Sequence, residues 1–450
     1  MRRLRAALAA LVARACAVVL RAAGRGATSL PGRVLLAIDP DAIAERAARL
    51  PGGSVVVSAT NGKTTTCSML ASILEEDGDL PVHNRAGANM AGGIASTLLE
   101  QHGDIGLFEV DEFWLDGLVG QLKPRAVVLG NLFRDQLDRY GELDTIVSRW
   151  SAVAAGADAG RLVLSADDPS IAGLGDGVDG ALYFGIEDSS VGTHSSQHAS
   201  EQVRCPRCAS SLAYSVWYVG HLGDYRCSRC DWARPQPAVT ASAIELLGLG
   251  GSRFTLGLDG RQLNVQIALP GLYNVYNATA AAAGALALGV DPETIAGGLQ
   301  GLVPVFGRAE MVEVAGRPCS ILLVKNPAGA NEVMRTVALE EGRHDMLFVL
   351  NDLIADGRDV SWIWDADFEA LVPRVASAVC SGTRAVEMAL RLKYAGVPDE
   401  SLSVVADVPA ALAAAAAGEG DRLLAFPTYT AMLDLREHLV NEGAARESFA

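Results

Sequence analysis

A turn that ends in Gly62-Lys63-Thr64-Thr65 follows an apolar run and precedes a helical pattern. The run at residues 54–59 predicts a buried β-strand, and we expect the helix to begin at about Lys63. In such a unit, backbone N–H groups bind phosphate, the lysine reaches the β- and γ-phosphates, and the threonine can bind Mg²⁺. The strict motif also needs a glycine where this chain has Val57. The residues therefore predict a variant phosphate loop, and a chance Gly-Lys-Thr turn is the alternative.

The order of motifs along the chain resembles that of the Mur ligase and folylpolyglutamate synthetase family. Residues 59–64 resemble its G-T-N-G-K-T loop, with Ala59 in place of a glycine. Later family motifs are matched by residues 131–141, 269–278, 306–310 and 325–327. Gln136 and Tyr273 stand where the family has histidines. The resemblance implies that ATP is bound by Thr60, Asn61, Gly62, Lys63, Thr64, Thr65, Asn277 and Arg308.

Two glutamates follow the apolar strand that is predicted to end near residue 108. A cation that bridges β- and γ-phosphates needs hard oxygen ligands. The family has a Mg²⁺-binding glutamate at this place, so the resemblance implies Glu109 or Glu112, together with Thr64, as the magnesium ligands. The spacing does not choose between the two glutamates, and both could also be surface acids at a strand end.

Only four of the 37 basic residues are lysines, and none lies between Lys123 and Lys325. Most amino-acid-adding members of the family carry a carbamylated lysine in that interval, where it binds a second Mg²⁺. The gap therefore favours a branch of the family that amidates a carboxylate over one that adds an amino acid.

Four cysteines form the pattern C-x₂-C-x₁₈-C-x₂-C. Two such knuckles are typical of a closed, structural Zn²⁺ site with four thiolate ligands. The predicted zinc ligands are Cys205, Cys208, Cys227 and Cys230. A zinc ribbon that folds an insertion at about residues 200–235 is the favoured interpretation, with nucleic-acid binding, an iron site or a redox pair as alternatives.

A segment rich in carboxylates and tryptophans, residues 351–365, follows a buried strand of the C-terminal region. With residues 83–90, 381–387 and 428–432, it resembles the amidating branch of the Mur ligase family. That resemblance implies ATP-dependent amidation of the D-glutamate α-carboxylate of lipid II through an acyl phosphate. It also implies that a separate GatD-like glutaminase subunit supplies ammonia. Asp356 or Asp359 of this chain would complete the Cys-His pair of that subunit. We favour Asp359, and both could instead be loop acids that cap the next helix.

The alternation of short apolar strands and helical patterns predicts an α/β protein with a parallel sheet. We expect an N-terminal helical segment (1–50), a Mur-ligase-type ATP-binding domain (51–304) with the zinc ribbon inserted, and a smaller α/β domain (305–450). An amino-acid-adding ligase and a non-catalytic nucleotide-binding scaffold are the alternative functions.

Arginines recur through the Ala/Leu/Val-rich stretch at residues 2–25, which predicts an amphipathic helix. It could pack on the protein itself, rest on an anionic membrane or be an export signal. The net charge of −16 excludes general nucleic-acid binding. The scattered cysteines outside the quartet favour a reducing cytoplasm. If the helix rests on a membrane, the protein would lie at the inner face of the cell membrane.

Overall fold

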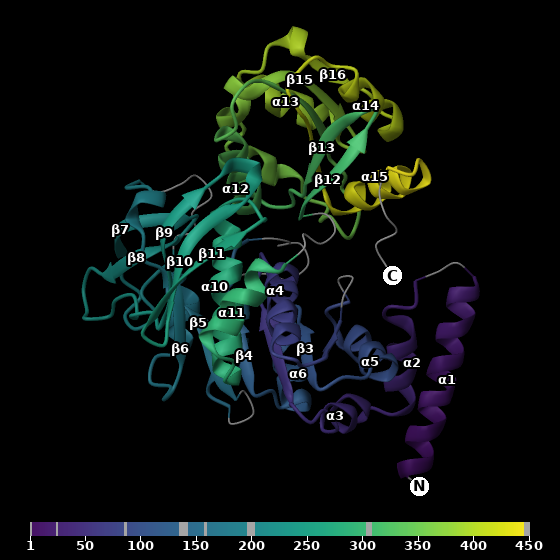
Figure 1. Cartoon of the computed structure of the whole chain (residues 1–450), viewed down its shortest axis with the longest axis vertical. Coiled ribbons are helices and arrows are strands. Elements are labelled where there is room, and N and C mark those ends of the chain that lie inside the picture. Colours follow the sequence, from purple (N-terminus) through teal and green to yellow (C-terminus); the bar gives the residue numbers. More distant parts are fainter. Residues whose placement is uncertain are drawn as a thin grey trace.

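The computed structural model describes residues 2–23, 26–84, 88–134, 143–156, 160–195, 203–302 and 308–444. Figure 1 shows a large α/β body, a smaller α/β body above it, and a long N-terminal helix at the outer edge. The α/β class, the inserted cysteine hairpin and the separate C-terminal α/β unit all agree with the sequence prediction.

A nine-stranded sheet forms the centre of the large body, in the order β11-β10-β9-β6-β5-β4-β1-β3-β2. Its strands are β1 (Ser54–Ser58), β2 (Pro81–His83), β3 (Ile105–Glu109), β4 (Ala126–Leu129), β5 (Arg161–Ser165), β6 (Leu182–Ile186), β9 (Val239–Leu246), β10 (Ser252–Leu258) and β11 (Arg261–Ile267). In this order, the neighbouring strands from β9 through β6, β5, β4, β1 and β3 to β2 are parallel, as predicted. Strands β10 and β11 are antiparallel to their neighbours, because short turns connect these strands and leave no room for a crossover helix.

Both faces of this sheet are covered, so its central strands β1, β3 and β4 are buried at every position and mostly apolar. Val55 and Val57 of β1 pack on the side of α4 (Lys63–Glu76), α10 (Leu272–Leu288) and α11 (Pro292–Gln300), whereas Val56 packs on the opposite side. This alternation follows from the two-residue period of a strand. The helices of the opposite side are α1 (Arg2–Ala22), α2 (Leu30–Ile38), α3 (Ala42–Ala47), α5 (Ala91–Glu100), α6 (Leu115–Leu122), α8 (Leu143–Ala154) and α9 (Pro169–Leu174).

The insertion forms a separate two-stranded antiparallel hairpin, β7 (Leu212–Val219) and β8 (Leu222–Cys227). Its own small core contains Cys205, Tyr225 and Trp232. Arg335 of α12 (Pro327–Ala338) donates a 2.8 Å hydrogen bond to the Tyr218 carbonyl, so the hairpin also contacts the C-terminal body.

The smaller body is a six-stranded sheet in the order β12-β13-β17-β14-β15-β16. Its strands are β12 (Arg308–Val314), β13 (Arg317–Leu322), β14 (His344–Val349), β15 (Val375–Ser381), β16 (Leu402–Val404) and β17 (Leu423–Pro427). The helices α12 and α13 (Ala385–Ala395) share one apolar core with the sheet, and α14 (Val408–Ala416) and α15 (Tyr429–Asn441) share the other. Only the edge strand β12 is antiparallel to its neighbour.

Candidate nucleotide and metal sites

The predicted phosphate loop lies between β1 and α4, and its conformation requires Gly62. This residue has a φ of +89°, and a Cβ atom there would lie 2.0 Å from the Asn277 amide oxygen on α10. Glycine therefore serves both a left-handed turn and a close approach. The contact also brings the predicted ATP-binding Asn277 next to the loop.

Side chains from the next parallel strand hold the loop in place. Asn131, which follows β4, accepts a 2.9 Å hydrogen bond from the Asn61 backbone N–H and donates a 3.0 Å bond to the Asn61 carbonyl. The buried Thr60 hydroxyl accepts a 3.1 Å bond from the Phe133 N–H. Thr64 and Thr65 lie in the first turn of α4. The loop is thus fixed by the carboxyl ends of the strands, where ligand sites of parallel α/β sheets lie.

Lys63 is held across the loop by Glu112. Its ammonium nitrogen lies 2.9 Å from the Glu112 carboxylate, and both side chains are largely buried. The ammonium also donates a hydrogen bond to the Ala59 carbonyl. Glu112 therefore compensates the charge of Lys63. Phosphate oxygens would take over this role if a nucleotide were bound.

Glu109 ends β3, next to β1, and is buried with one oxygen uncompensated. Within the part of the chain that the structure describes, its Oε2 atom has no hydrogen-bond partner. Its Oε1 atom accepts a 3.2 Å bond from Asn89, and its backbone is held by two 2.8 Å bonds with Asn84. A buried carboxylate oxygen without a donor is costly unless a cation binds it. The donor set therefore fits the Mg²⁺ ion that the sequence predicts.

The C-terminal body closes against the phosphate loop. Asn326 caps α12 through a 2.8 Å bond from Gly329 N–H and donates a 2.9 Å bond to the Asn61 side chain. Lys325 lies 3.5 Å from the Thr60 carbonyl. Burial, and then the negative charges of Glu109 and Asp356, raise the pKa of Tyr429 at the start of α15. Tyr429 belongs to a segment that was singled out for its resemblance, residues 428–432.

Two predicted elements of the site cannot be placed. Residues 135–142, which include Gln136, lie outside the described residues. Arg308 begins β12, but its side chain lies outside the description. Asn84, Asn89 and Asn131 are the supporting residues that sequence reasoning did not assign, because amides that hold a loop have no spacing rule of their own.

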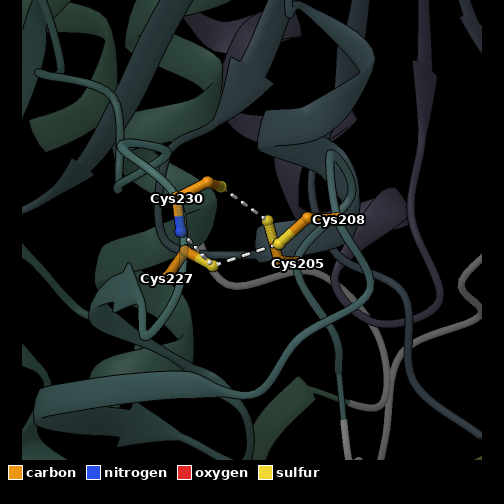
Figure 2. Close-up of side chains that lie close together, drawn as sticks. All are labelled: Cys205, Cys208, Cys227 and Cys230. Carbon is orange, nitrogen blue, oxygen red and sulfur yellow. Dashed lines mark hydrogen bonds between the residues drawn. The ribbon is translucent and has the colours of Figure 1, made fainter.

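The four predicted zinc ligands converge at the end of the β7–β8 hairpin. Figure 2 shows their side chains directed toward one another from two turns, and all four sulfur atoms lie within 4.8 Å of one another. Backbone N–H groups of Cys230 and Arg229 lower the pKa of Cys227, and hydrogen bonds with Ser210 lower the pKa of Cys208 to about 6. Burial raises the pKa of Cys205, and against a hydrogen bond from the Trp232 N–H, burial and the neighbouring thiols raise the pKa of Cys230 to about 12. This donor set fits a tetrahedral, closed Zn²⁺ site, because four thiolates without a further ligand position are typical of structural zinc.

The two aspartates of the C-terminal loop differ in their surroundings. Asp356 is buried and accepts hydrogen bonds from the Thr430 N–H at 2.7 Å and the Thr430 hydroxyl at 2.5 Å. It therefore holds the N-terminus of α15. Asp359 is exposed, and hydrogen bonds from Ser361 hold its pKa below the usual value. Of these two aspartates, only Asp359 has an exposed carboxylate.

Comparisons with known proteins agree with this geometry. Residues 57–212 match the Mur ligase middle domain, and residues 323–432 match the MurT ligase C-terminal domain. The chain is 33% identical to the lipid II isoglutaminyl synthase (glutamine-hydrolyzing) subunit MurT of Streptococcus pneumoniae, over 99% of both chains. It is also 33% identical to the same subunit of Staphylococcus aureus, over 93% of this chain and 94% of that one.

Solved structures show the same fold at lower identity. A pseudomurein peptide ligase type C from Methanothermus fervidus superposes with a TM-score of 0.68 at 24% identity, over 88% of this chain and 79% of the other. MurF from Acinetobacter baumannii gives a TM-score of 0.63 at 18% identity, over 91% and 80% of the two chains. With the phosphate loop, the cysteine site and the C-terminal domain in place, the chain belongs to the MurT family of Mur-type ligases.

Proposed function

We propose that this chain is the ATP-dependent ligase subunit that amidates the D-glutamate α-carboxylate of lipid II to D-isoglutamine. The observation that carries the proposal is the buried Glu109 carboxylate with an unpartnered oxygen, beside an intact loop lysine, in a chain of this family. A scaffold that binds Mg²⁺–ATP would use the same carboxylate, so the match to ligase subunits over nearly the whole chain is what favours catalysis.

The chain's own residues would position the phosphates and neutralise their charge. Lys63 would leave Glu112 for the phosphate oxygens, and the loop N–H groups would hold the β-phosphate. Glu109 and Thr64 would hold Mg²⁺, which supplies further charge neutralisation when bound. The carboxylate takes the γ-phosphoryl group and releases ADP. Ammonia then attacks the acyl carbon, phosphate leaves, and the ammonium nitrogen loses a proton to give the amide.

We propose that ammonia comes from a GatD-like glutaminase bound to the C-terminal body. Burial raises the pKa of Cys319 and of Cys380 to about 12, so neither thiol is an activated nucleophile. The cysteine quartet is taken up by the predicted zinc site. Asp359 would orient the imidazole of the partner's Cys-His pair. Leu353 and Ile354 of the same loop are exposed, as expected of an apolar docking surface beside it. We place this reaction in the cytoplasm, where lipid II precursors and ATP would meet.

One reconstitution distinguishes this function from its alternatives. The chain, a GatD-like glutaminase, ATP and a lipid II analogue are mixed with glutamine labelled with ¹⁵N at the side-chain amide. We expect the label in one new amide of the product, analysed by mass spectrometry. A product that gains a whole amino acid supports an amino-acid-adding ligase. Tight ATP binding without any product supports the scaffold.

A further inference from the structure

The outward face of α1 is apolar along its whole length. Leu4, Leu8, Leu11, Val18 and Val19 are between 56% and 76% exposed. The opposite face, with Ala9, Ala13 and Ala17, packs against the protein and is buried. In Figure 1 this helix stands at the outer edge of the large body, beside α2. We call its outward side the α1 apolar face.

Arginines flank this face, and acids are absent from the helix. At 100° per residue, Arg3, Arg14 and Arg21 lie along one border of the α1 apolar face and Arg5 along the other. Arg3 and Arg14 are exposed and form no ion pair within the described residues, although Arg14 donates a 3.4 Å hydrogen bond to the Leu99 carbonyl. Arg21 pairs with Glu100, and Arg5 pairs with Asp39 at 2.8 Å. The helix therefore combines a broad apolar surface with exposed positive charge at its border.

The charge of this region is opposite to that of the whole protein. The first 50 residues contain nine arginines and three carboxylates, a net charge of +6, whereas the complete chain carries −16. An anionic surface would therefore attract the molecule at this end and repel the rest of it. None of the described helices is long and apolar enough to cross a bilayer.

We infer that α1 binds the surface of an anionic lipid bilayer, lying flat with its apolar face in the headgroup region. A helix with an apolar face, arginines at its borders and no acids has the properties of an interfacial helix. A second copy fits less well, because a symmetric pairing of two α1 apolar faces would bring their arginine borders together. The inference does not depend on the proposed function, although a lipid-linked substrate would lie at the same surface.

The test is vesicle flotation of the full chain. The lipids are phosphatidylcholine alone and phosphatidylcholine mixed with phosphatidylglycerol, and we expect binding to the anionic vesicles that weakens as salt is raised. The variant L8Q/L11Q/V18Q should bind at least about tenfold more weakly, because it removes the apolar contact. Its melting temperature should not change, since the three side chains face solvent. The matched control V386Q/L390Q alters exposed apolar residues on α13 and should bind as the parent does.

A second variant keeps the test decisive if the first does not fold. R3Q/R14Q should lose most of the preference for anionic over neutral vesicles while it retains the apolar face. The inference is overturned if the parent does not float with anionic vesicles, or if the folded apolar variant binds as tightly as the parent. It is also overturned if the parent elutes as a dimer that L8Q/L11Q/V18Q converts to a monomer and neither form binds vesicles.

Discussion

The nucleotide site and the loop at residues 351–365 differ in the burial and the partners of their carboxylates. Around the phosphate loop, Glu109 and Glu112 are buried, and Lys63 and the amides of Asn84 and Asn89 surround them. On the C-terminal loop, Asp356 accepts a hydrogen bond from the N-terminus of α15, and Asp359 faces solvent. We propose that the first region positions phosphates with groups of this chain alone, and that Asp359 of the second acts on groups of another molecule.

Removal of the loop lysine should have the largest effect. Lys63→Ala should lower amidation by about 10³-fold whether glutamine or free ammonia supplies nitrogen, because phosphoryl transfer depends on charge neutralisation at this point. Product formation is followed by mass spectrometry, with Lys393→Ala, on the surface, as the control. Equal activity of both variants would contradict the assignment of the phosphate loop.

The two glutamates near the loop should differ in their effect on magnesium. Glu109→Gln should lower amidation by about 10²-fold and raise the Mg²⁺ concentration needed for half-maximal rate, because it removes a charged metal ligand. Glu112→Gln should have a smaller effect, because Glu112 already pairs with Lys63. Mg²⁺ titration of both variants is the measurement, and a larger shift for Glu112→Gln would reverse the assignment.

Substitutions of the two aspartates of the C-terminal loop should have different effects. One should impair the use of glutamine, and the other should lower the stability of the fold. Asp359→Asn should lower glutamine-driven amidation by about 10²-fold, because an oriented base contributes at least that much, and should leave ammonia-driven amidation unchanged. Asp356→Asn should instead destabilise the fold by about 1–2 kcal/mol, because it weakens the hydrogen bonds to the start of α15. Rates with each nitrogen source and thermal unfolding are compared. Equal losses with both nitrogen sources in Asp359→Asn would place that residue elsewhere in the mechanism.

The zinc site should have the smallest effect on catalysis. Cys205→Ala should abolish bound zinc, measured by elemental analysis, because a closed site needs all four thiolates. His221 in the β7–β8 turn lies 3.3 Å from Asp168, which also accepts a 2.9 Å bond from the Leu132 N–H near the loop. Loss of the ribbon should therefore weaken ATP affinity only a few-fold. Unchanged zinc content would exclude the ribbon.

The sequence predicted those features that depend on local pattern. The strand before Gly62, the start of α4 at Lys63 and the cysteine site all follow from short-range spacing. It could not predict that Asn326 would bind Asn61, because that contact joins residues far apart in the chain. Nor could spacing separate Asp356 from Asp359. The packing of α15 shows that the Asp356 carboxylate already accepts a hydrogen bond from the start of that helix.

We propose that the ligase site is complete within this chain and that only the supply of ammonia is shared. The most direct test uses the chain alone, with ATP, Mg²⁺, a lipid II analogue and ammonium chloride, and follows amide formation. We predict amidation with ammonium chloride, none with glutamine, and recovery of glutamine use when the glutaminase is added. If the chain needs its partner even with free ammonia, the ligase site is not complete within this chain.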